Sequence, residues 1–298
     1  MENKPAILID GKLIASNIKE EIKKEVAELL DKGQRPPHLV AVLVGNDGAS
    51  LSYVKSKEKQ SKEVGFMSSV YRFPSTITEK ELLQTIDFLN NDNDVDGYII
   101  QLPLPKQIDA KKVLEHVSPK KDVDGFHPTN AGRMLLSLPS YLPATPYGIM
   151  TLIERSGIET AGKHCVVIGR SDIVGTPMAV LLSRKGKYAD CTVTLCHSRT
   201  KNIKEICLTA DIIVVAIGKP HFLTADMVKE GAVVIDVGIH RIEDDSEKGY
   251  HIVGDVDFDN VKQKCSYITP VPGGVGPMTI VSLLTNTLKA YKKEIYKD

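Results

Sequence analysis

The sequence predicts an α/β protein with two domains, because strand and helix patterns alternate along most of its 298 residues. Apolar strands of the buried type occur at 39–44 and 165–168, and each is followed by a turn that contains glycine and then by a helical pattern. The proline-rich stretch 139–146 interrupts both patterns and is interpreted as the domain junction. We therefore expect mainly parallel sheets in two domains, over 1–145 and 146–278.

Charge and composition argue against several classes of function. The 38 basic and 38 acidic side chains cancel, so nothing favours a general attraction to nucleic acid or to an acidic membrane surface. No apolar run reaches the length of a membrane span, and the amino terminus lacks the apolar stretch of a signal peptide, so we expect a cytoplasmic protein. The five cysteines include no C-x-x-C pair and are interpreted as reduced packing residues.

Tyr53 and Lys57 form the first candidate site. The strand at 39–44 leads into a helix that we expect to have Ser50 as its N-cap and to stop at Gly65. Both side chains then lie on one helical face near the carboxyl end of a strand, where open α/β sheets bind ligands. Taken alone, the pair is also compatible with an ordinary solvated, lysine-rich face.

The following strands bring another polar group to the same edge. An alternating strand over Met67–Phe73 is followed by a capping box, Thr78 with Glu81, that begins an amphipathic helix. The strand Gly97–Ile100 then ends in Gln101, just before a proline-rich segment that cannot continue a central strand. Gln101 is thus expected at the same rim as the lysine of the earlier helix, although an ordinary strand-end amide is an equal alternative.

A short acidic loop at 121–128 contains Asp122 and Asp124. An Asp-x-Asp pattern can bind a cation, but a calcium loop needs further oxygen ligands at regular spacing and none follow, so we predict no metal site. By itself the loop favours turn chemistry with Gly125 at the corner, and His127 is interpreted as a loop residue.

The second domain opens with a candidate phosphate-binding loop. The strand at 165–168 runs into Gly169, several polar residues and Gly175, ahead of a helix at 178–182. Backbone N–H groups at such a helix start can hold a phosphate. The glycines are too far apart for the G-x-G-x-x-G fingerprint, so a plain strand-to-helix turn is an alternative.

The next strand indicates which nucleotide would bind. Thr192–Cys196 ends near Ser198 and Arg199, where NAD-binding folds usually place an acidic residue against the ribose. Arg170 lies in the glycine loop, and cations with a hydroxyl suit a 2′-phosphate, so NADP is favoured over NAD. Further strands at 212–216 and 233–237 complete a small Rossmann-like sheet.

The segment 268–279 is rich in proline and glycine but has no serine or charge. Because the prolines fix φ and the glycines allow close backbone approach, we predict a shaped loop against a flat ligand rather than a flexible linker. An amphipathic helix with Ile280, Leu284 and Leu288 on one face then ends the chain. We expect this helix, within 279–298, to pack on the first domain.

Five ordered motifs resemble those of the bifunctional methylenetetrahydrofolate dehydrogenase/cyclohydrolases. They are S-x-x-Y-V-x-x-K at 50–57, Q-L-P-L-P at 101–105, K-D-V-D-G at 121–125, G-R-S-x-I-V-G at 169–175 and P-V-P-G-G-V-G-P-M-T at 270–279. The resemblance spans almost the whole chain. It implies an amino-terminal α/β catalytic domain that binds folate, a Rossmann-like NADP-binding domain, a cleft between them, and a homodimer.

The resemblance also implies roles for individual residues. Lys57 would be the catalytic base and acid, Gln101 would tune it, and the other members of the catalytic set would be Tyr53 and Asp124. The residues implied to bind folate are Tyr53, Asp124, Pro272, Gly273 and Gly276. Those implied to bind NADP are Gly169, Arg170, Ser171, Ser198 and Ile239.

The implied reactions are oxidation of 5,10-methylenetetrahydrofolate with NADP+ and hydrolysis of the product to 10-formyltetrahydrofolate, within one-carbon metabolism and purine biosynthesis. The hydride step needs orientation, whereas the attacking water needs a base, which suits a lysine whose pKa is lowered by burial. A folate enzyme with only one activity is an alternative, and so is a non-catalytic NADP-sensing module. A short-chain dehydrogenase also uses Tyr-x-x-x-Lys, but there the pair follows the glycine loop, whereas here Lys57 precedes it.

Overall fold

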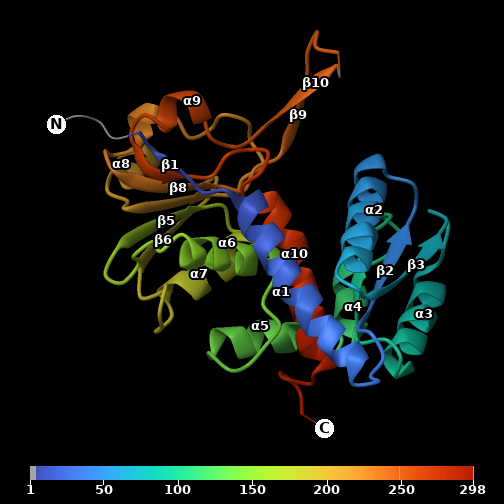
Figure 1. Cartoon of the computed structure of the whole chain (residues 1–298). Coiled ribbons are helices and arrows are strands. Elements are labelled where there is room, and N and C mark those ends of the chain that lie inside the picture. The colour runs from blue at the N-terminus through green and yellow to red at the C-terminus, as the bar shows by residue number, and fades with distance from the viewer. Residues whose placement is uncertain (1–4, 248, 298) are drawn as a thin grey trace. The chain divides into compact units, whose positions relative to one another are not determined.

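Residues 5–247 and 249–297 are described by the computed structural model shown in Figure 1. They form two units. The first unit combines the described residues up to Ala15 with Thr145–Thr279. The second combines Ser16–Ala144 with the described residues from Ile280 onward.

A three-stranded parallel sheet lies at the centre of the second unit. Its order is β3-β2-β4, so β2 (His38–Val44) lies between β3 (Met67–Phe73) and β4 (Gly97–Ile100). β2 is buried along its whole length, as expected for a central parallel strand that is covered on both faces. Because the strands are parallel, the residues that follow β2 and β4 come to the same edge of the sheet.

In the sequence of this unit, helices precede and follow the strands. They are α2 (Gly48–Glu63), α3 (Glu79–Asn91), α4 (Ala110–His116) and α5 (Pro128–Leu135), together with most of α1 (Gly11–Asp31) and α10 (Val275–Tyr291). The capping box of Thr78 and Glu81 begins α3, as the sequence indicated. Val42 of β2, Leu82 of α3 and Ile100 of β4 belong to one buried apolar cluster. This packing holds the carboxyl ends of the strands in place.

A six-stranded sheet forms the first unit. Its order is β1-β11-β8-β7-β5-β6, and every neighbouring pair of strands is parallel. The strands are β1 (Ile7–Leu8), β5 (His164–Ile168), β6 (Thr192–Cys196), β7 (Ile212–Val215), β8 (Ala232–Asp236) and β11 (Cys265–Ile268). The strand order reverses beside β5, and ligands of doubly wound sheets bind at the carboxyl ends of the strands at such a point.

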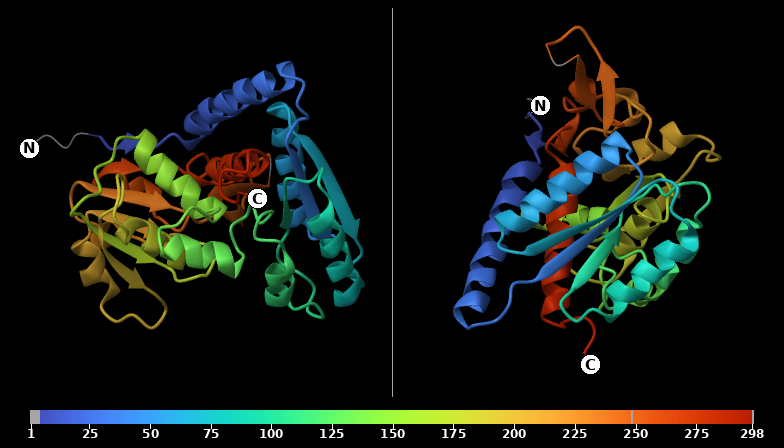
Figure 2. Two further views of the ribbon diagram at one scale, coloured as in Figure 1. Left: turned by 90° about the horizontal axis from the view of Figure 1, so that it is seen from below. Right: turned by 90° about the vertical axis from the view of Figure 1, so that its right-hand side faces the viewer.

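The other elements of this unit are helices and a hairpin. The helices are α6 (Ala144–Arg155), α7 (Gly175–Ser183), α8 (Ile203–Leu208), α9 (Phe258–Val261) and the short 3₁₀ helix η1 (Ala225–Met227). The antiparallel hairpin of β9 (His240–Glu243) and β10 (Tyr250–Val253) extends beyond the six-stranded sheet in Figure 1 and in the right-hand view of Figure 2. Within the described residues, no helix is long and apolar enough to cross a membrane.

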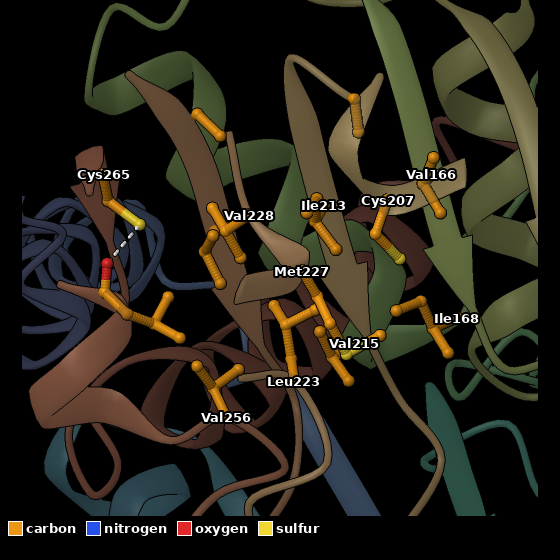
Figure 3. Close-up of a cluster of buried hydrophobic side chains, with 14 of the residues drawn as sticks. Val166, Ile168, Cys207, Ile213, Val215, Leu223, Met227, Val228, Val256 and Cys265 are labelled. Atoms are coloured by element: carbon orange, nitrogen blue, oxygen red, sulfur yellow. Dashed lines mark hydrogen bonds between the residues drawn. The ribbon is translucent and has the colours of Figure 1, made fainter. Parts of the chain in front are cut away.

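The apolar core of the first unit is shown in Figure 3. Strand residues such as Val166 and Ile213 pack there with Leu223 from a loop. All five cysteines are free and buried, which confirms their interpretation as packing residues. Burial raises the pKa of the Cys207 thiol to about 12. The Sγ atom of Cys265 donates to the carbonyl oxygen of Val261 at 3.2 Å, the dashed line in Figure 3.

Some boundaries differ from those that the sequence indicated. The N-cap of α2 is Asp47 rather than Ser50, because the Ser50 N–H donates to Asp47 Oδ2 at 2.8 Å and Ser50 is already helical. α10 begins at Val275, so Gly276 lies in its first turn rather than in a loop. The described residues up to Ala15 cluster with Thr145–Thr279 rather than with Ser16–Ala144, and β1 pairs with β11 in that first unit.

Candidate functional site

Tyr53 and Lys57 lie on neighbouring turns of α2, which follows the central strand of the small sheet. Tyr53 is 42% exposed, so its ring is open to a ligand. Lys57 is partly buried. The helix therefore carries an accessible phenol one turn away from a shielded amine.

Gln101 holds this amine at the end of β4. The backbone N–H of Gln101 donates to the carbonyl oxygen of Val42 at 2.9 Å, which fixes it beside the end of β2. Its side-chain Nε2 donates to the carbonyl oxygen of Leu102 at 2.8 Å, and its Oε1 accepts from Lys57 Nζ at 3.3 Å. The amide thus presents an acceptor, not a donor, to the lysine.

Asp124 and burial act in opposite directions on Lys57. Burial lowers the pKa of Lys57, and the charge of Asp124 raises it. Burial also raises the pKa of Asp124, which the charge of Lys57 lowers. The desolvation effect is the larger one for both groups. A lysine with a lowered pKa gives up its proton more readily than in water, which is the property that a catalytic base requires.

The loop that bears Asp124 is anchored by Asp122, for which only turn chemistry was expected. The Asp122 carboxylate accepts from the Phe126 N–H at 3.1 Å and from the His127 N–H at 2.8 Å. It also accepts from Asn130 Nδ2 at 2.8 Å. Burial raises the pKa of Asp122 to about 7 in spite of these donors. The carboxylate is therefore committed to holding the loop.

A second anchor of this loop comes from α10. The Nδ2 atom of the buried Asn286 donates to the carbonyl oxygens of Val123 at 2.8 Å and of Leu142 at 2.9 Å. These bonds fix the backbone immediately before Asp124. No local pattern could have identified Asn286, because its partners lie far away in the sequence.

In the first unit, the loop between β5 and α7 requires glycine at two positions. Gly169 has a φ of 120°, and a Cβ there would lie 2.2 Å from the carbonyl oxygen of Ala216. A Cβ on Gly175 would lie 1.9 Å from the carbonyl oxygen of Gly169. Ser171 Oγ accepts from the N–H groups of Val174 at 3.2 Å and Gly175 at 3.4 Å, which closes the turn.

This loop fits a phosphate-bearing nucleotide. Arg170 and Ser171 are exposed at the end of β5, and Ser198 is exposed after β6, the parallel neighbour of β5. The two strand ends therefore lie side by side. The start of α7 adds the partial positive charge of a helix amino terminus. Cations and hydroxyls at these positions suit the additional phosphate of NADP.

A pocket of about 150 Å³ lies in the same unit, beside the segment 270–274, which we call the Pro-Gly loop. Its lining includes four residues for which the resemblance implied a role in ligand binding, namely Ile239, Pro272, Gly273 and Gly276. Glycine backbone and apolar side chains form a surface that suits a flat ring.

The start of α1 packs directly on the Pro-Gly loop, which the sequence analysis did not foresee. The Lys12 N–H donates to the carbonyl oxygen of Gly273 at 3.0 Å. A Cβ on Gly11 would lie 1.9 Å from the carbonyl oxygen of Gly274, so the two backbones are in close contact. Lys12 also lines the pocket.

The expected site residues thus fall into separate groups within their units. Lys57, Gln101 and Asp124 interact in the second unit. Gly169, Arg170 and Ser171 share one loop of the first unit, and Ile239 lines a pocket there. Among the described residues, no cluster of His, Cys, Asp or Glu is arranged to hold a metal ion.

The fold and these groups define a class of protein, a nucleotide-dependent α/β enzyme that has its own proton-transferring side chain. Comparison with family models gives the family. The model "Tetrahydrofolate dehydrogenase/cyclohydrolase, catalytic domain" matches residues 9–124, and the model of the NAD(P)-binding domain of the same enzymes matches residues 143–295. The chain belongs to the tetrahydrofolate dehydrogenase/cyclohydrolase family, which confirms the resemblance seen in its motifs.

Similar proteins cover nearly the whole chain. The "Bifunctional protein FolD" of Cytophaga hutchinsonii is 62% identical over 95% of this chain and 98% of that protein. The protein of the same name from Porphyromonas gingivalis is 60% identical over 96% of this chain and 97% of its own length. The chain therefore matches nearly the whole length of these relatives.

Solved structures give the same fold. The bifunctional FolD methylenetetrahydrofolate dehydrogenase/cyclohydrolase of Campylobacter jejuni matches with a TM-score of 0.92 at 48% identity, over 97% of this chain and 99% of that one. The Trypanosoma brucei enzyme, described as complexed with NADP cofactor and inhibitor, matches with a TM-score of 0.92 at 37% identity, over 99% and 100% of the two chains. The predicted α/β fold with a catalytic and a nucleotide-binding domain is confirmed.

Proposed function

We propose that the chain oxidises 5,10-methylenetetrahydrofolate to 5,10-methenyltetrahydrofolate with NADP+ and hydrolyses the product to 10-formyltetrahydrofolate. The family of the chain and its bifunctional relatives support both activities. The observation that carries the hydrolytic half is the partly buried Lys57, whose amine contacts Gln101 Oε1 at 3.3 Å and whose pKa is lowered by burial.

For the oxidation, the protein needs to hold two reactants in the right orientation. We assign NADP binding to Gly169, Arg170, Ser171, Ser198 and Ile239, of which the glycine leaves room for close backbone approach. When bound, NADP+ supplies a hydride acceptor. The protein's own part in this step is orientation, because the transfer of a hydride to NADP+ leaves no proton for a side chain to accept.

For the hydrolysis, we assign the base to Lys57. Water that attacks the methenyl carbon must lose a proton, and the neutral amine of Lys57 accepts it. The positive charge of the methenyl bridge and the burial of the amine both favour the neutral form of Lys57. The same group can return a proton as the ring opens. Gln101 positions the amine in both protonation states through its Oε1 acceptor.

We assign folate binding to Tyr53 and Asp124, with Pro272, Gly273 and Gly276 as further contacts. The exposed ring of Tyr53 can stack on an aromatic ring system. The carboxyl group of Asp124 can hydrogen-bond the N–H groups of a pterin.

Parallel assays of both reactions on the purified chain test the proposal. Formation of NADPH from methylenetetrahydrofolate and loss of methenyltetrahydrofolate without added cofactor should both exceed the uncatalysed rates. Turnover in only one assay would identify an enzyme with a single activity. NADP+ binding without turnover in either assay would instead identify a sensing module.

We also propose that the chain forms a homodimer and works in the cytoplasm, in one-carbon metabolism that supplies purine biosynthesis. The five free, buried cysteines are in keeping with a reducing compartment. Light scattering at micromolar protein should give twice the mass of the 298-residue chain. A monomeric mass would refute the dimer.

A further inference from the structure

The proposed function leaves two buried carboxylates unexplained. Asp236 ends β8 and is 3% exposed, and Asp255 follows β10 and is fully buried. Burying an ionised carboxylate is costly unless hydrogen-bond donors surround it. Both side chains lie in the first unit, near the loops to which we assign NADP binding.

Asp255 organises the loop that follows β7. Its Oδ2 accepts from the N–H groups of Ile217 at 2.8 Å and Gly218 at 3.0 Å, and its Oδ1 accepts from the Lys219 N–H at 2.8 Å. The fourth donor is His240 Nε2, 2.7 Å from Oδ1. One carboxylate therefore fixes three successive peptide groups of this loop.

Asp236 organises the segment that follows β8. Its Oδ1 accepts from the Gly238 N–H at 2.9 Å and from the Asp255 N–H at 2.9 Å, and its Oδ2 accepts from the Val256 N–H at 3.0 Å. Burial raises the pKa of Asp236 to about 6, so the group is largely ionised at neutral pH. The next residue after the fixed Gly238 is Ile239, which lines the pocket.

Two glycines pack against the carboxylates in a reciprocal way. A Cβ on Gly238 would lie 2.5 Å from Asp255 Oδ1, and a Cβ on Gly254 would lie 1.8 Å from Asp236 Oδ2. Each glycine thus makes room for the carboxylate of the other segment. The two segments are therefore locked to each other and cannot shift independently.

The loop held by Asp255 also supports the phosphate-binding turn. A Cβ on Gly169 would lie 2.2 Å from the carbonyl oxygen of Ala216 and 3.4 Å from Ile217 Cγ2. The Ala216 N–H donates to the carbonyl oxygen of Ile168 at 2.8 Å. A displacement of Ile217 would therefore reach Gly169 directly.

We propose that Asp236 and Asp255 are positioning residues for the cofactor. Asp255 holds the loop that packs against Gly169, and Asp236 holds the backbone next to Ile239. Neither acts on the substrate, since their oxygens are taken by backbone donors and His240. The inference rests on the proposed NADP-dependent function and goes beyond it, because it assigns cofactor affinity to residues outside the binding loop.

The test measures NADP+ binding by calorimetry in Asp236→Asn and Asp255→Asn. An amide cannot accept at both of its ends, so each variant turns an N–H group toward at least one of the donors that hold the wild-type carboxylate. The dissociation constant for NADP+ should rise about 10- to 100-fold, as expected for lost hydrogen bonds to a charged group. KM for NADP+ should rise more than kcat falls, and hydrolysis without cofactor should stay within about twofold of wild type.

Asp211→Asn is the matched control. Asp211 lies in the same unit and accepts from the His164 N–H at 2.8 Å and from Lys229 Nζ at 2.6 Å, but it precedes β7, at the opposite end of the strand. It should leave NADP+ affinity unchanged. Equal weakening in this variant, or wild-type affinity in Asp255→Asn, would overturn the inference, and so would a parallel loss of hydrolysis.

His240 supplies a second test that does not depend on how well the aspartate variants fold. His240→Ala removes one donor to Asp255 and should weaken NADP+ binding, whereas His240→Gln retains a side-chain N–H and should restore most of it. Identical affinities in these two variants would contradict the positioning role. A wild-type chain that binds no NADP+ at all would overturn the proposed function itself.

Discussion

The Nζ atom of Lys57 lies 3.3 Å from Oε1 of Gln101, and the Nε2 atom of the same amide is held by the carbonyl oxygen of Leu102 at 2.8 Å. An acceptor that is itself fixed orients the amine without adding a charge beside it. The charge of Asp124 raises the pKa of Lys57, and burial, which lowers it, outweighs that charge. A neutral amide is therefore better suited to this position than a carboxylate, which would stabilise the ammonium form.

The Gln101→Glu variant tests this relationship. A carboxylate at the same distance favours protonated Lys57 and raises its pKa, so the rising limb of the pH profile of hydrolysis should move to higher pH. At pH values below the pKa of Lys57, the rate should fall about tenfold for each unit by which that pKa rises. The uncharged Gln101→Met variant should lower the rate without this displacement. Superimposable profiles of Gln101→Glu and wild type would show that Lys57 does not titrate in the reaction.

The Asp122→Asn variant should change the pH dependence of stability. Burial raises the pKa of Asp122 from 3.8 to about 7, so the folded state favours the protonated form. The stabilisation that the raised pKa of Asp122 adds to the folded state is fully present below about pH 4 and is lost as the pH rises through 7. The wild-type free energy of unfolding should therefore fall across this range. Since each pKa unit corresponds to about 1.4 kcal/mol, the loss is of the order of a few kcal/mol.

Urea unfolding at pH 5 and pH 8 measures this difference. The variant does not titrate at position 122, so its free energy of unfolding should fall less between the two pH values than that of the wild type. Other titrating groups are common to both proteins and cancel in the comparison. Parallel curves would mean that Asp122 is already ionised at pH 5.

The Arg170→Ala variant tests the choice of nucleotide. Arg170 is exposed in the loop after β5, and an arginine there can pair with a 2′-phosphate that NAD+ lacks. The variant should lose about 10- to 100-fold in kcat/KM with NADP+ and much less with NAD+. Lys185→Ala removes an exposed cation just beyond α7 and should leave the ratio unchanged. Equal losses with both nucleotides, or a wild-type preference for NAD+, would refute this assignment.

Local patterns predicted the fold where the signal is strong over a few residues. The strands Met67–Phe73, Gly97–Ile100 and Thr192–Cys196 have the bounds that the sequence indicated, and α3 has its capping box. The hairpin of β9 and β10 was not predicted, because half-exposed strands with charged residues lack an apolar run. The short helices α4 and α5 were missed because one or two turns give little periodicity.

The part of the candidate site that lies at the ends of parallel strands was predictable, because such strands bring their carboxyl ends to one edge of the sheet. The sequence placed Lys57 and Gln101 at one edge, and the structure puts their side chains in contact. The anchors of the site were not predictable. The bonds from Asn286 to Val123 and from Ile217 to Asp255 join residues far apart in the sequence, and only the folded chain brings them together.

The ratio of the two activities in Lys57→Met shows whether the amine of Lys57 is the base for hydrolysis. The substitution keeps an unbranched side chain as far as the ε position but removes the amine, so hydrolysis should fall by a factor of about 100 to 10,000, as for loss of a general base. Oxidation needs orientation only and should retain activity wherever folate still binds, which a separate affinity measurement checks. Lys55→Met, an exposed lysine of the same helix, should change neither activity. The ratio of hydrolysis to oxidation should collapse in Lys57→Met, whereas hydrolysis near the wild-type rate would show that Lys57 is not the base.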